Sequence, residues 1–233
     1  MHRIGLLVCD HVSPEFSHVA GDYPDMFQRL FASQPDIELV PYDLTQGRFP
    51  ASPDACDGWI TTGSRLSVYD DIGWIEDFGR LVQSIAETER RFVGVCFGHQ
   101  MIAHALGGKV ERAANGWGIG LKEVAVPEPP SWWGRERYRV LNSHADQVVD
   151  LPPGTAVLGG NDHCPVSLMT TGDTMLGIQG HPEFPPAYAA ALIRARRGVL
   201  IAEEVSAAGL ASLSAAPDTE FLAGALGRFL RGS

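Results

Sequence analysis

Paired cysteines of the kind that build a disulfide framework or a zinc ribbon are absent from this sequence. Its four cysteines, Cys9, Cys56, Cys96 and Cys164, lie far apart and form no C-x-x-C pair. No apolar run approaches the ~18 residues that a membrane span requires. The apolar run from Ile4 to Val8 is also too short for the core of a signal peptide. These absences lead us to expect a reduced, cytoplasmic compartment.

Basic charge is also scarce, because 18 lysines and arginines face 28 aspartates and glutamates, which gives a formal net charge of −10. Such a chain is not expected to bind nucleic acid without a local basic patch. The one dense basic cluster, Arg194, Arg196 and Arg197, lies inside a helical pattern, and we interpret it as a solvated helix face. A G-x-x-x-x-G-K-[ST] phosphate loop is missing, so no ATP-dependent synthetase domain is expected within these 233 residues.

Apolar runs alternate with helical patterns through the first half of the chain. Strands are expected over 4–9, 37–42, 59–62 and 92–95, and helices over 24–31 and 75–85. This alternation predicts a parallel sheet covered by helices on both faces, with ligands at the carboxyl ends of the strands. In the second half, residues 110–126 are rich in glycine and β-branched residues, and further strands, partly antiparallel, are expected over 137–141, 156–158, 166–169 and 175–179. Helices are then expected over 185–197, 199–213 and 219–230.

The most informative stretch joins the expected strand at 92–95 to a helix. It contains the pattern G-x-C-x-G at 94–98, the cysteine counterpart of the nucleophile elbow, which is a tight strand-to-helix turn. Gly94 and Gly98 flank the turn because a Cβ there would clash where the strand and helix backbones come close. Cys96 is expected at a helix N-terminus, where free N–H groups and the helix dipole favour the thiolate. A buried structural cysteine is the alternative, but the bracketing glycines favour a nucleophile.

A cysteine nucleophile requires a base, and the base requires a group that orients it. Among eight histidines, His181 stands out because it follows the expected strand at 175–179 and precedes Pro182 and Glu183. Side chains two residues apart point to the same side of an extended backbone, and Pro182 biases His181 towards that conformation. Glu183 can therefore hold the imidazole in the tautomer that accepts a proton. A surface pair at a strand end is the alternative interpretation of the same spacing.

Three motifs together carry a resemblance to a known family: G-V-C-F-G-H-Q at 94–100, S-H-A-D-Q-V at 143–148 and Q-G-H-P-E at 179–183. In order and spacing they resemble the class I glutamine amidotransferases, and most of all the GMP-synthetase-like glutaminases, a branch that also contains stand-alone γ-glutamyl peptidases. The resemblance covers roughly residues 4 to 190. It implies an α/β, flavodoxin-like, doubly wound fold with a mainly parallel sheet, helices on both faces and a smaller antiparallel extension. We expect a single domain over 1–233, with C-terminal helices at about 199–231 as an extension.

The resemblance also implies catalytic roles. Cys96 matches the nucleophile, His181 the base and Glu183 the acid that orients the base. The oxyanion hole would use the backbone N–H groups of Gly63 and Phe97. One departure concerns this hole, because the family often has Gly-Gly-Pro where this chain continues from Gly63 with serine and arginine.

Four further positions match residues that hold the glutamyl end of the substrate in this family: Gln100, Asn142, Ser143 and His144. We interpret His144 and Asp146 of the S-H-x-D pattern as structural or pocket-shaping, since a second base has no task. The implied mechanism requires no cofactor and no metal. A metal pair of His99 and His104 is not expected, because residues five apart do not share a helix face well.

The implied reaction is hydrolysis of the γ-amide of glutamine through a cysteinyl thioester, with the ammonia passed to a separate synthase. The alternative hypothesis is a free-standing hydrolase of γ-glutamyl peptides or amides. A third, less favoured hypothesis is a catalytically silent binding or regulatory protein. The expected partners are therefore a small-molecule substrate and, if ammonia is passed on, a synthase, with no nucleic acid and no membrane. Trp132 and Trp133 could line a pocket or meet a partner, although anchoring of a loop onto the core is the more typical role.

Overall fold

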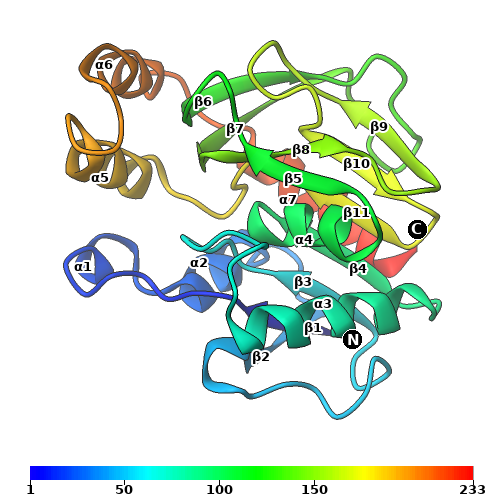
Figure 1. Ribbon diagram of the computed structural model, residues 1–233. Helices are drawn as coiled ribbons and strands as arrows, with labels where there is room; N and C mark the ends of the chain where they lie inside the picture. Colours follow the sequence, from blue (N-terminus) through cyan, green and yellow to red (C-terminus); the bar gives the residue numbers. More distant parts are fainter. Residues whose placement is uncertain (233) are drawn as a thin grey trace.

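The computed structural model describes residues 1–232, and its centre is a seven-stranded sheet (Figure 1). The strands follow the order β2 (Ile37–Asp43), β1 (His2–Val8), β3 (Gly58–Thr61), β4 (Arg91–Val95), β11 (Met175–Ile178), β10 (Leu168–Thr171) and β9 (Thr155–Gly159). The first five run parallel, and β10 and β9 add two antiparallel strands at one edge. The expected flavodoxin-like, mainly parallel α/β architecture is therefore confirmed.

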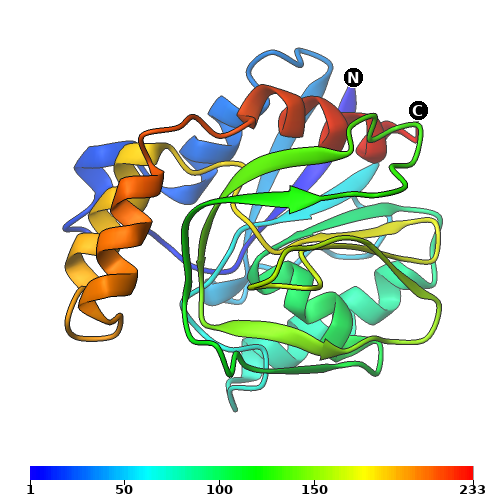
Figure 2. The same ribbon diagram turned by 90° about the horizontal axis from the view of Figure 1, so that it is seen from above.

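Helices cover both faces of this sheet (Figures 1 and 2). On one face lie α3 (Gly73–Ala86) and α4 (Phe97–Ala105), and on the other lie α2 (Tyr23–Leu30) and α7 (Thr219–Arg231). Each of these helices buries a stripe of apolar residues against the sheet, which is why the 3.6-residue pattern could be recognised in the sequence. Between them, β1 is buried from Ile4 to Val8, as expected for a central parallel strand. Two short elements, α1 (Ser17–Ala20) and a 3₁₀ turn (Leu44–Gln46), lie in the connections.

Two antiparallel ribbons form the smaller extension. β5 (Lys109–Arg112) pairs with β8 (Asp146–Asp150), and β6 (Gly118–Ala125) pairs with β7 (Arg137–His144). The sequence did not predict β8, because this five-residue strand begins and ends with aspartate and has no clear alternation. The N–H of His181 donates to the carbonyl of Leu141 in β7 at 2.7 Å. This bond brings the second and third sequence motifs side by side.

The C-terminal helices do not form one common extension. α5 (Pro186–Arg196) and α6 (Glu203–Ser212) pair at one side of the molecule in both views (Figures 1 and 2). α7, by contrast, buries Leu222 and Phe229 in the main core. The helix expected from residue 199 begins only at Glu203, because Gly198 adopts a φ of 69° and donates its N–H to Ile201 in a turn. Across residues 1–232, no helix has both the length and the hydropathy to cross a membrane.

The segment that contains Trp132 and Trp133 is fastened to α7. The ring of Trp133, which is fully buried, lies with its centroid 5.0 Å from that of Tyr138 and 5.3 Å from that of Phe221. Trp132 packs on Phe229 at 5.1 Å. Both tryptophans therefore anchor a loop onto the core, and neither lines the cavity described below.

Candidate active site

Cys96 occupies the turn between β4 and α4, where the G-x-C-x-G pattern predicted an elbow. Its φ of 50° is the only positive φ of a non-glycine residue among residues 1–232, and such a conformation is costly for an L-residue. A Cβ on Gly94 would overlap the backbone of Gly98, and a Cβ on Gly98 would overlap the side chain of Thr61. The two glycines thus permit the close approach of strand and helix that bends the chain sharply at Cys96.

His181 reaches Cys96 from the segment that follows β11. A Cβ built on Gly63 would lie 2.7 Å from Cε1 of His181 and 3.6 Å from Cβ of Cys96, so both side chains border the same glycine. Nδ1–H of His181 donates to Oε1 of Glu183 at 2.7 Å, which is the contact that the two-residue spacing suggested. Both partners are buried, with 4% of the His181 side chain and none of the Glu183 side chain exposed. The remaining ring nitrogen, Nε2, is then free to exchange a proton.

The surroundings of His181 favour its protonated form. Burial disfavours the charge, but the carboxylate of Glu183 and the sulfur of Cys96 outweigh burial and raise the pKa of His181 to about 10. The imidazole also stacks on the ring of Phe184, with 3.8 Å between centroids and 12° between planes. An aromatic face attracts a cation, so Phe184 both orients the ring and supports its charge.

The two expected oxyanion donors come from different elements. Gly63 follows the end of β3, and Phe97 is the first residue of α4. Neither backbone N–H donates a hydrogen bond within the part of the chain that the structure describes. Free N–H groups at a helix start and beside a reactive side chain are suited to binding a developing negative charge.

A cavity of about 430 Å³ opens over Cys96 and His181. Three of the four residues expected to hold the substrate line it, namely Gln100, Ser143 and His144. The fourth, Asn142, does not line the cavity, because its side chain turns back and donates to the carbonyl of Val140 at 3.0 Å. The structure therefore does not bring Asn142 together with the other three.

The cavity-lining polar residues are held by hydrogen bonds. The amide of Gln100 donates to the backbone carbonyl of Asp146 at 2.9 Å and to Oε1 of Gln179 at 3.1 Å. Nδ1 of His144 bonds the same carbonyl of Asp146 at 3.1 Å. Burial lowers the pKa of His144 to about 3, so this ring is neutral and suits the pocket-shaping role expected for it.

A family model described as glutamine amidotransferase class-I matches residues 26–194 of the chain. The chain belongs to this family. The matched span contains the elbow cysteine and the His181–Glu183 pair. It also contains most of the sheet and the ribbon that borders the cavity.

Relatives of this amidotransferase include both peptidases and synthase components. It is 28% identical over 191 residues to γ-glutamyl peptidase 5 of Arabidopsis thaliana, with 78% of this chain and 76% of that protein covered. It is 33% identical over 179 residues to the GMP synthase of Thermomicrobium roseum, a match that covers 73% of this chain but only 32% of the synthase. A crystal structure of a glutamine amidotransferase from Thermotoga maritima has the same fold, with a TM-score of 0.77, 21% identity and 99% of each chain covered.

Beyond the motifs, the amidotransferase has an ion pair that the sequence did not indicate. The carboxylate of Asp10, two residues beyond the end of β1, accepts from the backbone N–H of Arg65 at 3.0 Å and from its guanidinium at 2.8 Å. This pair ties down the loop that follows Gly63, where the chain departs from Gly-Gly-Pro. The two residues lie 55 positions apart, so no local pattern could have linked them.

The interpretation of the basic cluster on α5 is wrong for one of its members. Arg194 and Arg197 are exposed, as a solvated face requires, but Arg196 is partly buried and lines the cavity. Its guanidinium lies over the ring of Trp117 at 5.1 Å and donates to Oγ of Ser143 at 2.6 Å. The error arises because α5 is rich in alanine and arginine and has no clear apolar stripe to show which side faces inward.

Metal ligands do not cluster in the described part of this amidotransferase. Among residues 1–232, no group of three or more histidine, cysteine, aspartate or glutamate side chains is arranged to hold a metal ion. His99 is fully buried whereas His104 is exposed, so these two side chains lie on different faces of α4. All four cysteines are free thiols.

Proposed function

We propose that this amidotransferase hydrolyses γ-glutamyl amide bonds, with Cys96 as nucleophile, His181 as acid and base, and Glu183 as the orienting carboxylate. The observation that carries the proposal is the strained elbow at Cys96, with His181 bordering the same glycine and backed by Glu183. A strained conformation at one non-glycine residue persists only where the surrounding structure enforces it, and such positions gather at functional sites.

The reaction begins when the thiolate of Cys96 attacks the γ-carbonyl carbon of the substrate. The carbonyl oxygen becomes an oxyanion, which the backbone N–H groups of Gly63 and Phe97 stabilise; each such donor typically supplies a factor of about 10²–10³ in rate. The C–N bond then breaks, the leaving amine takes the proton from His181, and the glutamyl group remains on Cys96 as a thioester.

Water completes the cycle. His181, now neutral, removes a proton from a water molecule, whose oxygen attacks the thioester carbon. The C–S bond breaks, glutamate leaves, and the thiolate and the protonated imidazole are restored. The net reaction is a γ-glutamyl amide plus water giving glutamate plus an amine. The pKa of His181, raised to about 10, keeps the proton available for the leaving amine at neutral pH.

Among γ-glutamyl amides, we favour peptides and other substituted amides as substrates. The match to γ-glutamyl peptidase 5 extends over three quarters of both chains, whereas the match to GMP synthase covers a third of that protein. The cavity of about 430 Å³ falls in the range of sites for small organic ligands, so it has room for a leaving group larger than ammonia. Supply of ammonia to a separate synthase is the second candidate, supported by the 33% identity to the synthase relative.

A substrate panel on the purified chain tests this proposal. We expect turnover of γ-glutamyl peptides without any partner, and loss of that turnover to background in Cys96→Ala. Cys56→Ala is the matched control, because Cys56 is also a buried free thiol but does not line the cavity, and this variant should retain activity. Unchanged turnover in Cys96→Ala would refute the catalytic assignment, and activity with glutamine only after a synthase is added would favour the second candidate.

A further inference from the structure

Two arginines that line the cavity over Cys96 form no ion pair with a carboxylate within residues 1–232. The guanidinium of Arg196 lines this cavity, lies over the Trp117 ring at 5.1 Å and donates one hydrogen bond, to Ser143, at 2.6 Å. Within residues 1–232 it forms no ion pair with an aspartate or a glutamate. A guanidinium has five N–H donors arranged in a fork that fits a carboxylate, so most of the binding capacity of Arg196 is unused.

Such an arrangement is unfavourable without an anionic ligand. Burial disfavours the charged guanidinium and lowers the pKa of Arg196. Buried charges in proteins are generally paired, because removing a charge from water is costly. Arg194 on the same helix and Arg197, which directly follows the helix, avoid this cost by remaining exposed, and Arg197 pairs with Glu203. Arg196, in contrast, is partly withdrawn from water and has no carboxylate partner among residues 1–232.

A second arginine strengthens the positive field. Arg112, at the end of β5, also lines the cavity, and its guanidinium lies over the same Trp117 ring at 5.8 Å. Arg65 lines the cavity too, but Asp10 neutralises it. Two cavity arginines thus lack a carboxylate partner within residues 1–232.

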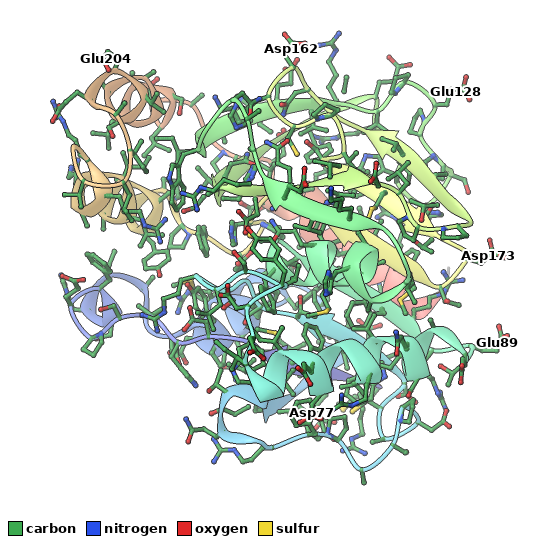
Figure 3. All side chains as sticks on the ribbon, in the orientation of Figure 1. Asp77, Glu89, Glu128, Asp162, Asp173 and Glu204 are labelled. Carbon is green, nitrogen blue, oxygen red and sulfur yellow. The ribbon has the colours of Figure 1, made fainter. Side chains whose placement is uncertain are left out.

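The acidic residues of the chain do not compensate for these charges. Among the residues that line the cavity, only Asp146 is acidic, and one of its carboxylate oxygens accepts from Ser67. Most acidic side chains lie elsewhere. Figure 3 shows six exposed acidic residues spread around the outside of the molecule, on α3, on α6 and on outer loops: Asp77, Glu89, Glu128, Asp162, Asp173 and Glu204. These six acidic side chains are therefore exposed at the surface and do not line the cavity.

We infer that Arg196 binds a carboxylate of the substrate, with Arg112 adding attraction over the same tryptophan ring. The inference rests on the proposed function for the identity of the substrate, a γ-glutamyl compound. Two carboxylates of such a compound have this chemistry: the α-carboxylate of the glutamyl group, and a carboxylate on the leaving amine, as in a γ-glutamyl peptide. The contact of Arg196 with Ser143, a residue expected to hold the glutamyl end, is compatible with the first source, and the large cavity with the second.

Binding to the Cys96→Ala protein separates these sources without requiring turnover. The probes, measured by calorimetry, are γ-glutamylglycine with both carboxylates, γ-glutamylglycinamide with only the α-carboxylate, and 4-aminobutyrylglycine with only the terminal one. We expect Arg196→Gln in this background to weaken binding of γ-glutamylglycine about 10- to 100-fold, the usual effect of losing charge-assisted hydrogen bonds. Arg194→Gln, an exposed arginine on the same helix, should leave binding unchanged.

The pattern across the probes decides the assignment. If the affinity loss spares 4-aminobutyrylglycine, Arg196 binds the α-carboxylate; if it spares γ-glutamylglycinamide, Arg196 binds the carboxylate of the leaving amine. Equal loss for all three probes, no loss for any, or no binding of any probe by Cys96→Ala would overturn the inference. Arg196→Lys should give an intermediate loss, because it keeps the charge but not the fork. Failure of the proposed function would instead appear as no hydrolysis by the intact Cys96 protein while selective carboxylate binding persists.

Discussion

Gly98 is the residue on which the close approach of α4 to β3 depends, and Gly98→Ala tests that approach directly. A Cβ at this position would overlap the side chain of Thr61, which is fully buried. Thr61 cannot move aside easily, because its β-branched side chain is stiff and its Oγ1 accepts the N–H of Val95 at 3.0 Å. The added methyl group must therefore shift α4, and Cys96 with it, or break that hydrogen bond.

The expected magnitude follows from three effects. Overpacking of a core typically costs about 1–3 kcal/mol, and leaving the buried N–H of Val95 without a partner costs about 1–3 kcal/mol more. Alanine in place of glycine in a helix returns up to about 1 kcal/mol. We expect a net loss of about 2 kcal/mol or more in the free energy of unfolding, which for a chain of this size lowers Tm by about 4–8 °C.

Thermal unfolding and the alkylation rate of Cys96 by iodoacetamide measure the two consequences. The matched control is Gly79→Ala in the neighbouring helix α3, where the nearest atom to the new Cβ is Sδ of Met101 at 3.7 Å, an ordinary contact. That variant should be as stable as the parent or about 0.5–1 kcal/mol more stable. If Gly98→Ala were as stable as the parent and reacted as fast at Cys96, the argument that packing at Gly98 shapes the elbow would be refuted.

Two further variants test the electrostatics and the loop. Glu183→Gln removes the charge that raises the pKa of His181, so the alkaline limb of kcat/KM should move to lower pH and kcat should fall about 10²–10⁴-fold. A histidine whose pKa is raised in the folded protein stabilises the fold at pH values below its unfolded pKa, near 6.5, and this stabilisation is lost as the pH rises through the folded pKa. Glu183→Gln should therefore lower Tm more at pH 6 than above pH 10. Equal losses of Tm at the two pH values would contradict this. Asp10→Asn weakens the hold on Arg65 and hence on the loop that carries Gly63, so kcat should fall up to about 10²-fold while Cys96 alkylation stays at the parent rate. An unchanged kcat would show that the loop keeps its shape without the ion pair.

Much of the site could be predicted because its parts are encoded by short spacings. The elbow needs only a strand, a cysteine and two glycines within a few residues, and the structure places Cys96 in that turn with the expected close backbone approach. The contact of His181 with Glu183 follows from the alternation of an extended chain. The ends of helices were predicted less accurately where a single turn sets them. The turn at Gly198, for example, places the start of α6 later in the chain than expected.

The direction in which several polar side chains point could not be predicted in the same way. Asn142 belongs to the same motif region as Ser143, yet its amide turns back to Val140 and away from the cavity. Arg196 and Arg194 have the same side chain on the same helix, but only Arg196 lies against Trp117. Which of them faces inward depends on how α5 packs, and the composition of α5 gives no apolar stripe that would reveal it.

The sequence by itself determined the alternation of strands and helices, the bend at Cys96 and the pairing of His181 with Glu183, because each depends on backbone geometry over a few consecutive residues. Only the tertiary structure decided that Asp10 holds Arg65, that Asn142 is outside the cavity, and that Arg112 and Arg196 each lie over the ring of Trp117. Asp10 and Arg65 lie 55 positions apart, and which way Asn142, Arg112 and Arg196 point is set by the packing of whole elements against the sheet.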